Sequence, residues 1–311
     1  VYVWGQCQLA IQNEPCVAVV RLVRTDWRRC SCWDFVWRCT YADASNPNQV
    51  GRTVLCFGAN ESMNILLTND DGIRAPGIIA LHEALDGLGT IDVFAPETVQ
   101  SAMSHGITYT KPLMVQTLDI TPKMRGVSIG GRPADCVKLA LRSLWEEKYG
   151  KGTRPDLTIS GMNSGANVGI NVIYSGTVAA AIESAFLGVP AIAVSLYIGN
   201  RDSICYERAA SFARTAIDRI LEHEIKPHEV VNLNIPICES DGMPCPSIKV
   251  ANMNTAGDLG TYDKRTSPDG RTYYWAAGSG MEFAHTTEGS DVEVLKEGSM
   301  TVTPLSFDLT D

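Results

Sequence analysis

Two adjacent carboxylates, Asp70 and Asp71, directly follow an apolar stretch that begins at Met63. Such a stretch predicts a buried strand, and ligands of open α/β sheets bind at the carboxyl ends of the strands. Two ionised acids at this place repel each other and lose hydration, so they need a compensating positive charge. A divalent cation is the simplest compensating group. The alternative is structural: Asp71-Gly72 forms a turn and Asp70 caps the next helix.

Two neutral oxygen donors follow other predicted strands. Ser101 lies in a polar loop after the strand Ile91–Pro96, and Asn163 follows the strand Leu157–Ser160. Carboxylate, hydroxyl and amide oxygens together are the donors that Mg²⁺, Mn²⁺ or Ca²⁺ prefer over zinc. The sequence therefore predicts a metal site at one edge of a sheet.

An anion site is predicted beside these donors. Ser175-Gly176-Thr177 precedes an alanine-rich helix, 178–188, so its N–H groups, two hydroxyls and the positive end of the helix dipole are available to an anion. The alternative is that Ser175 or Thr177 only caps the helix. A metal beside a phosphate polarises a phosphoryl oxygen and activates water, which indicates metal-assisted hydrolysis of a phosphomonoester.

Other chemistries fit the residues less well. A dinucleotide-binding oxidoreductase needs a GxGxxG turn after the first strand, and Asn69-Asp70-Asp71-Gly72 is not one. A non-enzymatic, Mg²⁺-binding phospho-signalling module needs an acceptor Asp at the end of a central strand, where this chain has Asn163. Asp70 could attack phosphorus covalently, but we favour ligand roles for both acids because a metal-activated water needs no covalent step. His105 could protonate the leaving group, although a lone loop histidine is more often structural.

The elements that must position these residues alternate between strands and helices. They predict an α/β fold with a mostly parallel sheet, because short strand–helix–strand units cross over in one hand. The predicted strands are Met63–Thr68, Ile91–Pro96, Leu157–Ser160, Ala191–Ser195 and Val230–Ile235; extended pieces are predicted at 108–119 and 127–130, and helices at 76–87, 133–144, 178–188 and 203–222.

From Cys238 onward, repeated turn signals and the aromatic piece Thr272–Trp275 predict β-hairpins outside the parallel sheet. Such an arm either packs on a partner subunit or remains on its own subunit, and the pattern alone leaves both open. Asp291–Leu295 and Ser299–Leu305 are predicted as two more strands. We thus expect a catalytic core at 63–237 and a C-terminal β-rich oligomerisation arm with closing strands at 238–311.

Composition limits the remaining possibilities. The net charge of −9 argues against a nucleic-acid partner, and no run of eighteen apolar residues is present to span a membrane. The four cysteines after residue 62 are scattered, which favours a reducing cytoplasm. Residues 1–62 differ from the rest: they hold six of the ten cysteines and four of the six tryptophans, but no Met, Lys or His. We expect them to be disordered or translated from upstream, with Met63 as the natural start.

The chain resembles the SurE family of survival protein E 5′-nucleotidases. The matching runs are ILLTNDDGIRAPG (65–77), Ala95-Pro96 with Gln100-Ser101-Ala102 and His105, GRPADCVKLAL (131–141), SGMNSGANVG (160–169), YSGTVAAA (174–181), GVPAIAVSL (188–196) and TPLSFDLT (303–310). They cover the chain from Met63 onward and leave residues 1–62 without a counterpart.

This resemblance implies a Rossmann-like core, helices on both faces of the sheet, a swapped C-terminal arm and a homodimer or homotetramer. It also implies a phosphatase that hydrolyses nucleoside 5′-monophosphates with one divalent ion per subunit, Mg²⁺ or Mn²⁺; 3′-monophosphates and short polyphosphate are further candidate substrates.

The family's residues can be carried over one by one. Its metal ligands fall on Asp70, Asp71, Ser101 and Asn163; of these, we expect Asp70, Asp71 and Asn163 to be catalytic. Its phosphate-facing residues fall on Asn167, Ser175, Gly176 and Thr177. Two departures concern substrate preference only: Glu97 stands where Asp is usual, and Arg132 where Thr is usual.

Overall fold

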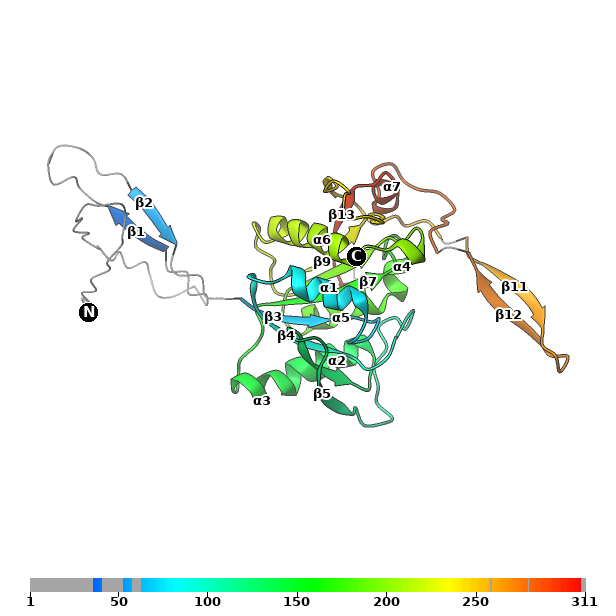
Figure 1. Ribbon diagram of the computed structural model, residues 1–311, viewed down its shortest axis with the longest axis horizontal. Coiled ribbons are helices and arrows are strands. Elements are labelled where there is room, and N and C mark those ends of the chain that lie inside the picture. Colours follow the sequence, from blue (N-terminus) through cyan, green and yellow to red (C-terminus); the bar gives the residue numbers. More distant parts are fainter. Residues whose placement is uncertain (1–35, 41–52, 58–62, 258, 279, 309–311) are drawn as a thin grey trace. The chain divides into compact units, whose positions relative to one another are not determined.

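The computed structural model describes residues 36–40, 53–57 and 63–308, except residues 258 and 279 (Figure 1). The chain divides into two compact units, Val1–Glu61 and Ser62–Asp311. In the first unit, β1 (Val36–Thr40) pairs antiparallel with β2 (Thr53–Phe57). The other predictions for residues 1–62 lie outside the described part of the chain.

The second unit contains a nine-stranded mixed sheet. Its strand order is β10-β13-β9-β8-β7-β3-β4-β6-β5, and the pairs from β9 through β8, β7, β3 and β4 to β6 are all parallel. β13 and β5 pair antiparallel with β9 and β6. The strands are β3 (Met63–Thr68), β4 (Gly89–Pro96), β5 (Val115–Asp119), β6 (Arg125–Ile129), β7 (Leu157–Ser164), β8 (Ala191–Leu196), β9 (Val230–Ile235), β10 (Ile248–Val250) and β13 (Met300–Leu305). The predicted mostly parallel α/β fold is confirmed.

Helices cover both faces of this sheet (Figure 1). They are α1 (Pro76–Ala84), α2 (Pro133–Leu139), which continues through a π-helical turn (Ala140–Leu144) into α3 (Trp145–Tyr149), α4 (Asn171–Tyr174), α5 (Gly176–Phe186), α6 (Tyr206–Ile220) and α7 (Asp291–Lys296), with a 3₁₀ turn at Arg201–Ser203. α1 packs with α6, and α2 packs with α5.

The core explains why β3 lacks an alternating pattern. Leu67 belongs to a cluster with Leu81 of α1 and Phe212 of α6, whereas its neighbour Leu66 packs with Phe94 and Trp145 on the opposite face. A strand that is covered on both faces is apolar at successive positions. Burial on both faces therefore suits β3 as an interior strand between β7 and β4. Asp70 and Asp71 follow the carboxyl end of this strand.

Two predictions about local structure are wrong. Asp291–Leu295 is not a strand but most of α7, because the buried Asp291 carboxylate accepts the N–H groups of Gly169, Asn254 and Val292 at the start of this helix. These contacts come from distant segments of the chain. They outweigh the tendency to form a strand that the alternating pattern Asp-Val-Glu-Val predicts. Of the extended piece 108–119, only β5 is a strand.

The predicted hairpin after Cys238 is present. β11 (Thr261–Thr266) pairs antiparallel with β12 (Thr272–Ala277) around the turn at Asp269-Gly270. Tyr262, Tyr274 and Trp275 expose more than half of their side chains. The same C-terminal region also supplies β10 and β13, which close the main sheet.

Candidate active site

Three neighbouring strands, β7, β3 and β4, bring the predicted metal ligands to one edge of the sheet. β3 lies between the other two and pairs parallel with both, so their carboxyl ends lie at the same edge. Asp70 and Asp71 follow β3, Ser101 lies in the loop after β4, and Asn163 lies in β7. β7 continues to Ser164 beyond its predicted end, through an irregularity in register between Ser160 and Asn163.

Asp70 is almost completely buried, with 5% of its surface exposed. Burial raises the pKa of its carboxyl to about 6, the charge of Asp71 raises the pKa as well, and the Thr177 hydroxyl lowers it by donating a hydrogen bond to Oδ1. Gly176 makes this close packing possible: a Cβ there would lie 3.1 Å from Asp70 Oδ2. A negative charge at this position therefore calls for a positive partner.

Asp71 is partly exposed and is held from β7. Its Oδ2 accepts the backbone N–H of Ser164 at 2.8 Å, and the Ser164 hydroxyl in turn pairs with the Tyr206 hydroxyl at 3.0 Å. The other oxygen, Oδ1, accepts no hydrogen bond within the described chain. The Asp70 carboxylate, by contrast, also interacts with the backbone N–H groups of Asp70 and Thr177, which lower its pKa. Asp71 thus keeps one carboxylate oxygen for a cation.

Asn163 presents an oxygen rather than its NH₂ group. Its Nδ2 donates to the carbonyl of Gly165 at 2.6 Å, which leaves Oδ1 as the group not used by the loop. No cluster of three or more His, Cys, Asp or Glu side chains suited to a metal occurs in the described ranges. Two carboxylates completed by neutral oxygens are therefore the donor set that the described residues offer, and this set fits a hard divalent cation.

Ser101 is exposed on a loop that hydrogen bonds hold against the site. The N–H of Gln100 donates to the Asp70 carbonyl at 2.8 Å. Ser104 donates its N–H to Tyr174 and its hydroxyl to Ile173. The hydroxyl of Ser101 is therefore carried by a loop that is fixed on both sides of it.

The start of α5 lies against Asp70. Ser175 caps the helix by accepting the N–H of Val178 at 3.1 Å, as the alternative interpretation predicted. Thr177 directs its hydroxyl to Asp70 instead of leaving it free. The first N–H groups of a helix have no partner within the helix, so the start of α5 still offers a donor at Gly176.

Asn167 lies deeper than the other predicted phosphate ligands. Its Nδ2 donates to Ser195 Oγ at 2.8 Å, its N–H donates to Asn234, and its carbonyl accepts from both Asn232 and Asn234. These bonds fasten the loop after β7 onto β8 and β9. The side chain is 7% exposed, and its phosphate-binding role stays a prediction.

His105 is linked to two residues that the sequence did not single out. Its Nε2 lies 2.8 Å from Oε2 of Glu183 in α5, and Oε1 of Glu183 lies 3.2 Å from Nζ of Lys138 in α2. Glu183 is 5% exposed. Glu183 is an acid within an otherwise apolar helix face, and a buried carboxylate needs partners. This was the sequence signal that could have indicated its contacts with His105 and Lys138. His105 thus fastens the Ser101 loop to two helices, which supports its structural role.

Asp135 fastens the other end of the same loop. Its carboxylate accepts the N–H and the hydroxyl of Thr108 at 2.8 and 2.7 Å, and the N–H of Arg132 at 2.9 Å. The sequence indicated only that Asp135 suits the helix dipole in the first turn of α2. Its contact with Thr108, 27 residues away, depends on the tertiary fold.

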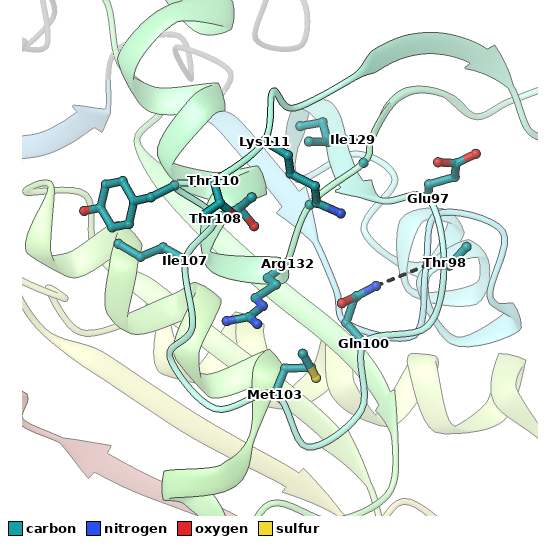
Figure 2. Close-up of a pocket in the computed structure, with 13 residues that line it drawn as sticks. Glu97, Thr98, Gln100, Met103, Ile107, Thr108, Thr110, Lys111, Ile129 and Arg132 are labelled. Atoms are coloured by element: carbon teal, nitrogen blue, oxygen red, sulfur yellow. Dashed lines mark hydrogen bonds between the residues drawn. The ribbon is translucent and has the colours of Figure 1, made fainter.

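A pocket of about 530 Å³ lies beside the site (Figure 2). It is lined by the loop after β4, the end of β6 and the start of α2; the lining side chains include Glu97, Gln100, Met103, Tyr109, Lys111 and Arg132. Gln100 is the residue before Ser101, so the pocket and the site share this loop.

Comparisons with known proteins identify relatives of this chain. The family model of survival protein SurE matches residues 65–257. The 5′-nucleotidase SurE of Rhodopirellula baltica is 44% identical over 248 residues, which cover 80% of this chain and 94% of that protein. The 5′-nucleotidase SurE of Heliobacterium modesticaldum is 41% identical over 250 residues, or 80% of this chain and 88% of that one.

A solved structure shows the same fold. The crystal structure of the SurE protein from Aquifex aeolicus superposes with a TM-score of 0.65 at 36% identity, covering 80% of this chain and 95% of that one. The resemblance inferred from the motifs is confirmed: the chain belongs to the SurE family.

Proposed function

We propose that this protein hydrolyses nucleoside 5′-monophosphates to a nucleoside and inorganic phosphate, using one divalent ion, Mg²⁺ or Mn²⁺, per subunit. The observation that carries the proposal is the buried Asp70 beside Asp71, whose Oδ1 accepts no hydrogen bond in the described chain, at a helix start suited to an anion. Relatives named 5′-nucleotidases support this activity.

Asp70, Asp71, Ser101 and Asn163 would hold the ion, and Asp70, Asp71 and Asn163 are the catalytic residues of the proposal. When bound, the ion supplies positive charge that polarises the phosphoryl group and eases deprotonation of a water molecule. The donor set fits Mg²⁺ or Mn²⁺ because all of its atoms are hard oxygens and two of them carry negative charge.

Residues at the start of α5 and in the loop after β7 would bind and orient the phosphate. The start of α5, with Ser175, Gly176 and Thr177, and the loop residue Asn167 form the proposed phosphate seat. Gly176 offers its N–H group along the helix axis, where the dipole favours negative charge. Ser175 and Thr177 support the seat indirectly, since the first caps the helix and the second orients Asp70.

No observation favours the signalling alternative. The acceptor carboxylate that it needs at the end of the central strand β7 is replaced by Asn163, whose amide is oriented by Gly165. Hydrolysis of 3′-monophosphates and of short polyphosphate belongs to the same proposal, since both end in a phosphoryl group of the same charge.

Assembly and location are further parts of this proposal. The exposed Tyr262, Tyr274 and Trp275 of the β11–β12 hairpin support a homodimer or homotetramer that forms through this arm, because such side chains are favoured at interfaces. Cys136, Cys205, Cys238 and Cys245 are free thiols, which supports a cytoplasmic location. Among the described helices, none is both long and apolar enough to cross a bilayer.

Phosphate release from a panel of nucleoside monophosphates tests the activity. We expect turnover that EDTA abolishes and that Mg²⁺ or Mn²⁺ restores. Asp71→Asn should abolish turnover while leaving the circular dichroism spectrum and the unfolding midpoint close to those of the wild type. Full turnover in EDTA, or by the Asp71→Asn variant, would contradict the proposed roles.

A further inference from the structure

The pocket beside the active site holds an unpaired, half-buried cation. Arg132 ends the turn before α2 and directs its guanidinium along the loop that carries Met103 and Ile107 (Figure 2). Within the described ranges, no carboxylate or carbonyl accepts a hydrogen bond from this guanidinium. A partly desolvated charge of this kind is costly unless a ligand compensates it.

A second cation lines the same pocket. Lys111 is exposed, and its ammonium has no ion-pair partner in the described part of the chain. Glu97 is the one acid in the lining, and its carboxylate points away from Arg132 in Figure 2. The pocket is therefore locally positive in a protein whose net charge is −9.

The pocket adjoins the phosphate seat at two points. Gln100 lies in the pocket wall, and its N–H donates to the Asp70 carbonyl at 2.8 Å. Pro133 follows Arg132, and its Cγ would lie 3.1 Å from a Cβ at Gly176, as would Asp70 Oδ2. A ligand group in the pocket would thus be a near neighbour of a phosphoryl group at the start of α5.

Gly106 provides the space for the guanidinium. A Cβ at this residue would lie 2.0 Å from Nη1 of Arg132 and 3.0 Å from its Cζ. The backbone of Gly106 does not require the left-handed conformation, so the lack of a side chain matters here only for space. An alanine would displace the flexible end of Arg132 and would leave its charge in the protein.

We infer that this pocket binds a second phosphate of the substrate, with Arg132 as the specificity-determining residue and Lys111 in support. The substrate class is a nucleoside bisphosphate, whose ribose carries a phosphate at the 3′ position besides the scissile 5′ phosphate. A planar guanidinium binds a phosphate through two parallel hydrogen bonds, whereas a neutral base would leave its charge uncompensated. The inference rests on the proposed phosphatase function.

Equilibrium binding in EDTA, measured by calorimetry on the full chain, tests the inference apart from catalysis. Adenosine 3′,5′-bisphosphate should bind about tenfold or more tightly than 5′-AMP, because hydrogen bonds to charged groups are strong. Arg132→Gln and Gly106→Ala should both bring this ratio close to one, and Lys111→Gln should lower it less. Arg142→Gln, at an exposed arginine of the π-helical turn, and Lys123→Gln are matched controls that should leave the ratio unchanged.

Each contrary result has a distinct meaning. Equal binding of the two ligands by the wild type, or a ratio unchanged in Arg132→Gln, would overturn the inference. If the unchanged ratio comes with equally weaker binding of both ligands in Arg132→Gln, the pocket holds the nucleoside. A preference for ADP over the bisphosphate would also overturn the inference. Phosphate release from 5′-AMP tests the proposed function separately, since it can succeed or fail whichever ligand binds better.

Discussion

Replacing Asp70 by Asn should stabilise the metal-free protein while it removes metal binding. The replacement keeps the size of the side chain and an oxygen that can accept the Thr177 hydroxyl, but it removes the buried charge. Burial raises the pKa of Asp70 from 3.8 to about 6. At about 1.36 kcal/mol per pKa unit, ionising this carboxyl in the folded, metal-free protein costs about 3 kcal/mol.

The sign of the pH dependence follows from this raised pKa. A carboxyl whose pKa is higher in the folded than in the unfolded protein stabilises the fold when it is protonated, and that contribution is lost as the pH rises through about 6. The free energy of unfolding of Asp70→Asn should therefore exceed that of the wild type by about 3 kcal/mol at pH 8 in EDTA. Below about pH 4 the two values should be nearly equal.

Urea unfolding at a fixed protein concentration measures this difference at several pH values. For a chain of 311 residues, about 3 kcal/mol corresponds to a rise of roughly 5 °C in melting temperature. Mg²⁺ should raise the stability of the wild type but not that of Asp70→Asn. The control Asp86→Asn, at an exposed acid, should be no more stable than the wild type in EDTA and should still be stabilised by Mg²⁺. A variant that is no more stable than the wild type at pH 8 in EDTA would refute this account of Asp70.

Three further substitutions test the surroundings of the site. Thr177→Val removes the hydrogen bond that lowers the pKa of Asp70, so this pKa should rise above about 6 in a carboxyl NMR titration of the metal-free protein. His105→Ala breaks the contact with Glu183 and should cost about 1–3 kcal/mol in unfolding free energy. Because His105 fastens the loop that carries Ser101, His105→Ala should also weaken activation by Mg²⁺. A fall of a hundredfold or more in kcat would indicate that His105 is a general acid instead. Gly161→Ala would place a Cβ 2.2 Å from a carbonyl of β8 and should destabilise the fold by about 2 kcal/mol or more in urea.

The parallel sheet could be predicted because its strands are buried on both faces. Apolar runs such as β3 and β8, separated by helices with a clear apolar face, leave few other arrangements. Short segments held by distant contacts could not be predicted in this way. α7 forms where its first residue, Asp291, accepts N–H groups from Gly169 and Asn254, and nothing within the segment itself indicates these partners.

That Asp70, Asp71 and Asn163 lie at the same end of the sheet could be predicted from parallel strands, and their role as metal ligands stays a proposal. Adjacent parallel strands end at one edge, so Asp70, Asp71 and Asn163 have to lie near one another. The orientation of individual polar groups does not follow from strand order. The side chain of Asn167 turns to Ser195, and the hydroxyl of Thr177 turns to Asp70, because buried polar groups take the partners that the packing provides.

The burial of Asp70 shows how packing links the fold to the chemistry. A Cβ at Gly176 would lie 2.9 Å from Asp70 Cβ and 3.1 Å from Pro133 Cγ, so the starts of α5 and α2 close around the carboxylate and leave little room for water. This closure raises the pKa of Asp70 and makes its negative charge costly without a cation. Because the same helix start offers N–H groups to an anion, a cation and a phosphate would each relieve a charge imbalance that the other leaves. Stability, metal affinity and substrate affinity should therefore be thermodynamically coupled at this one contact between two helices and a strand.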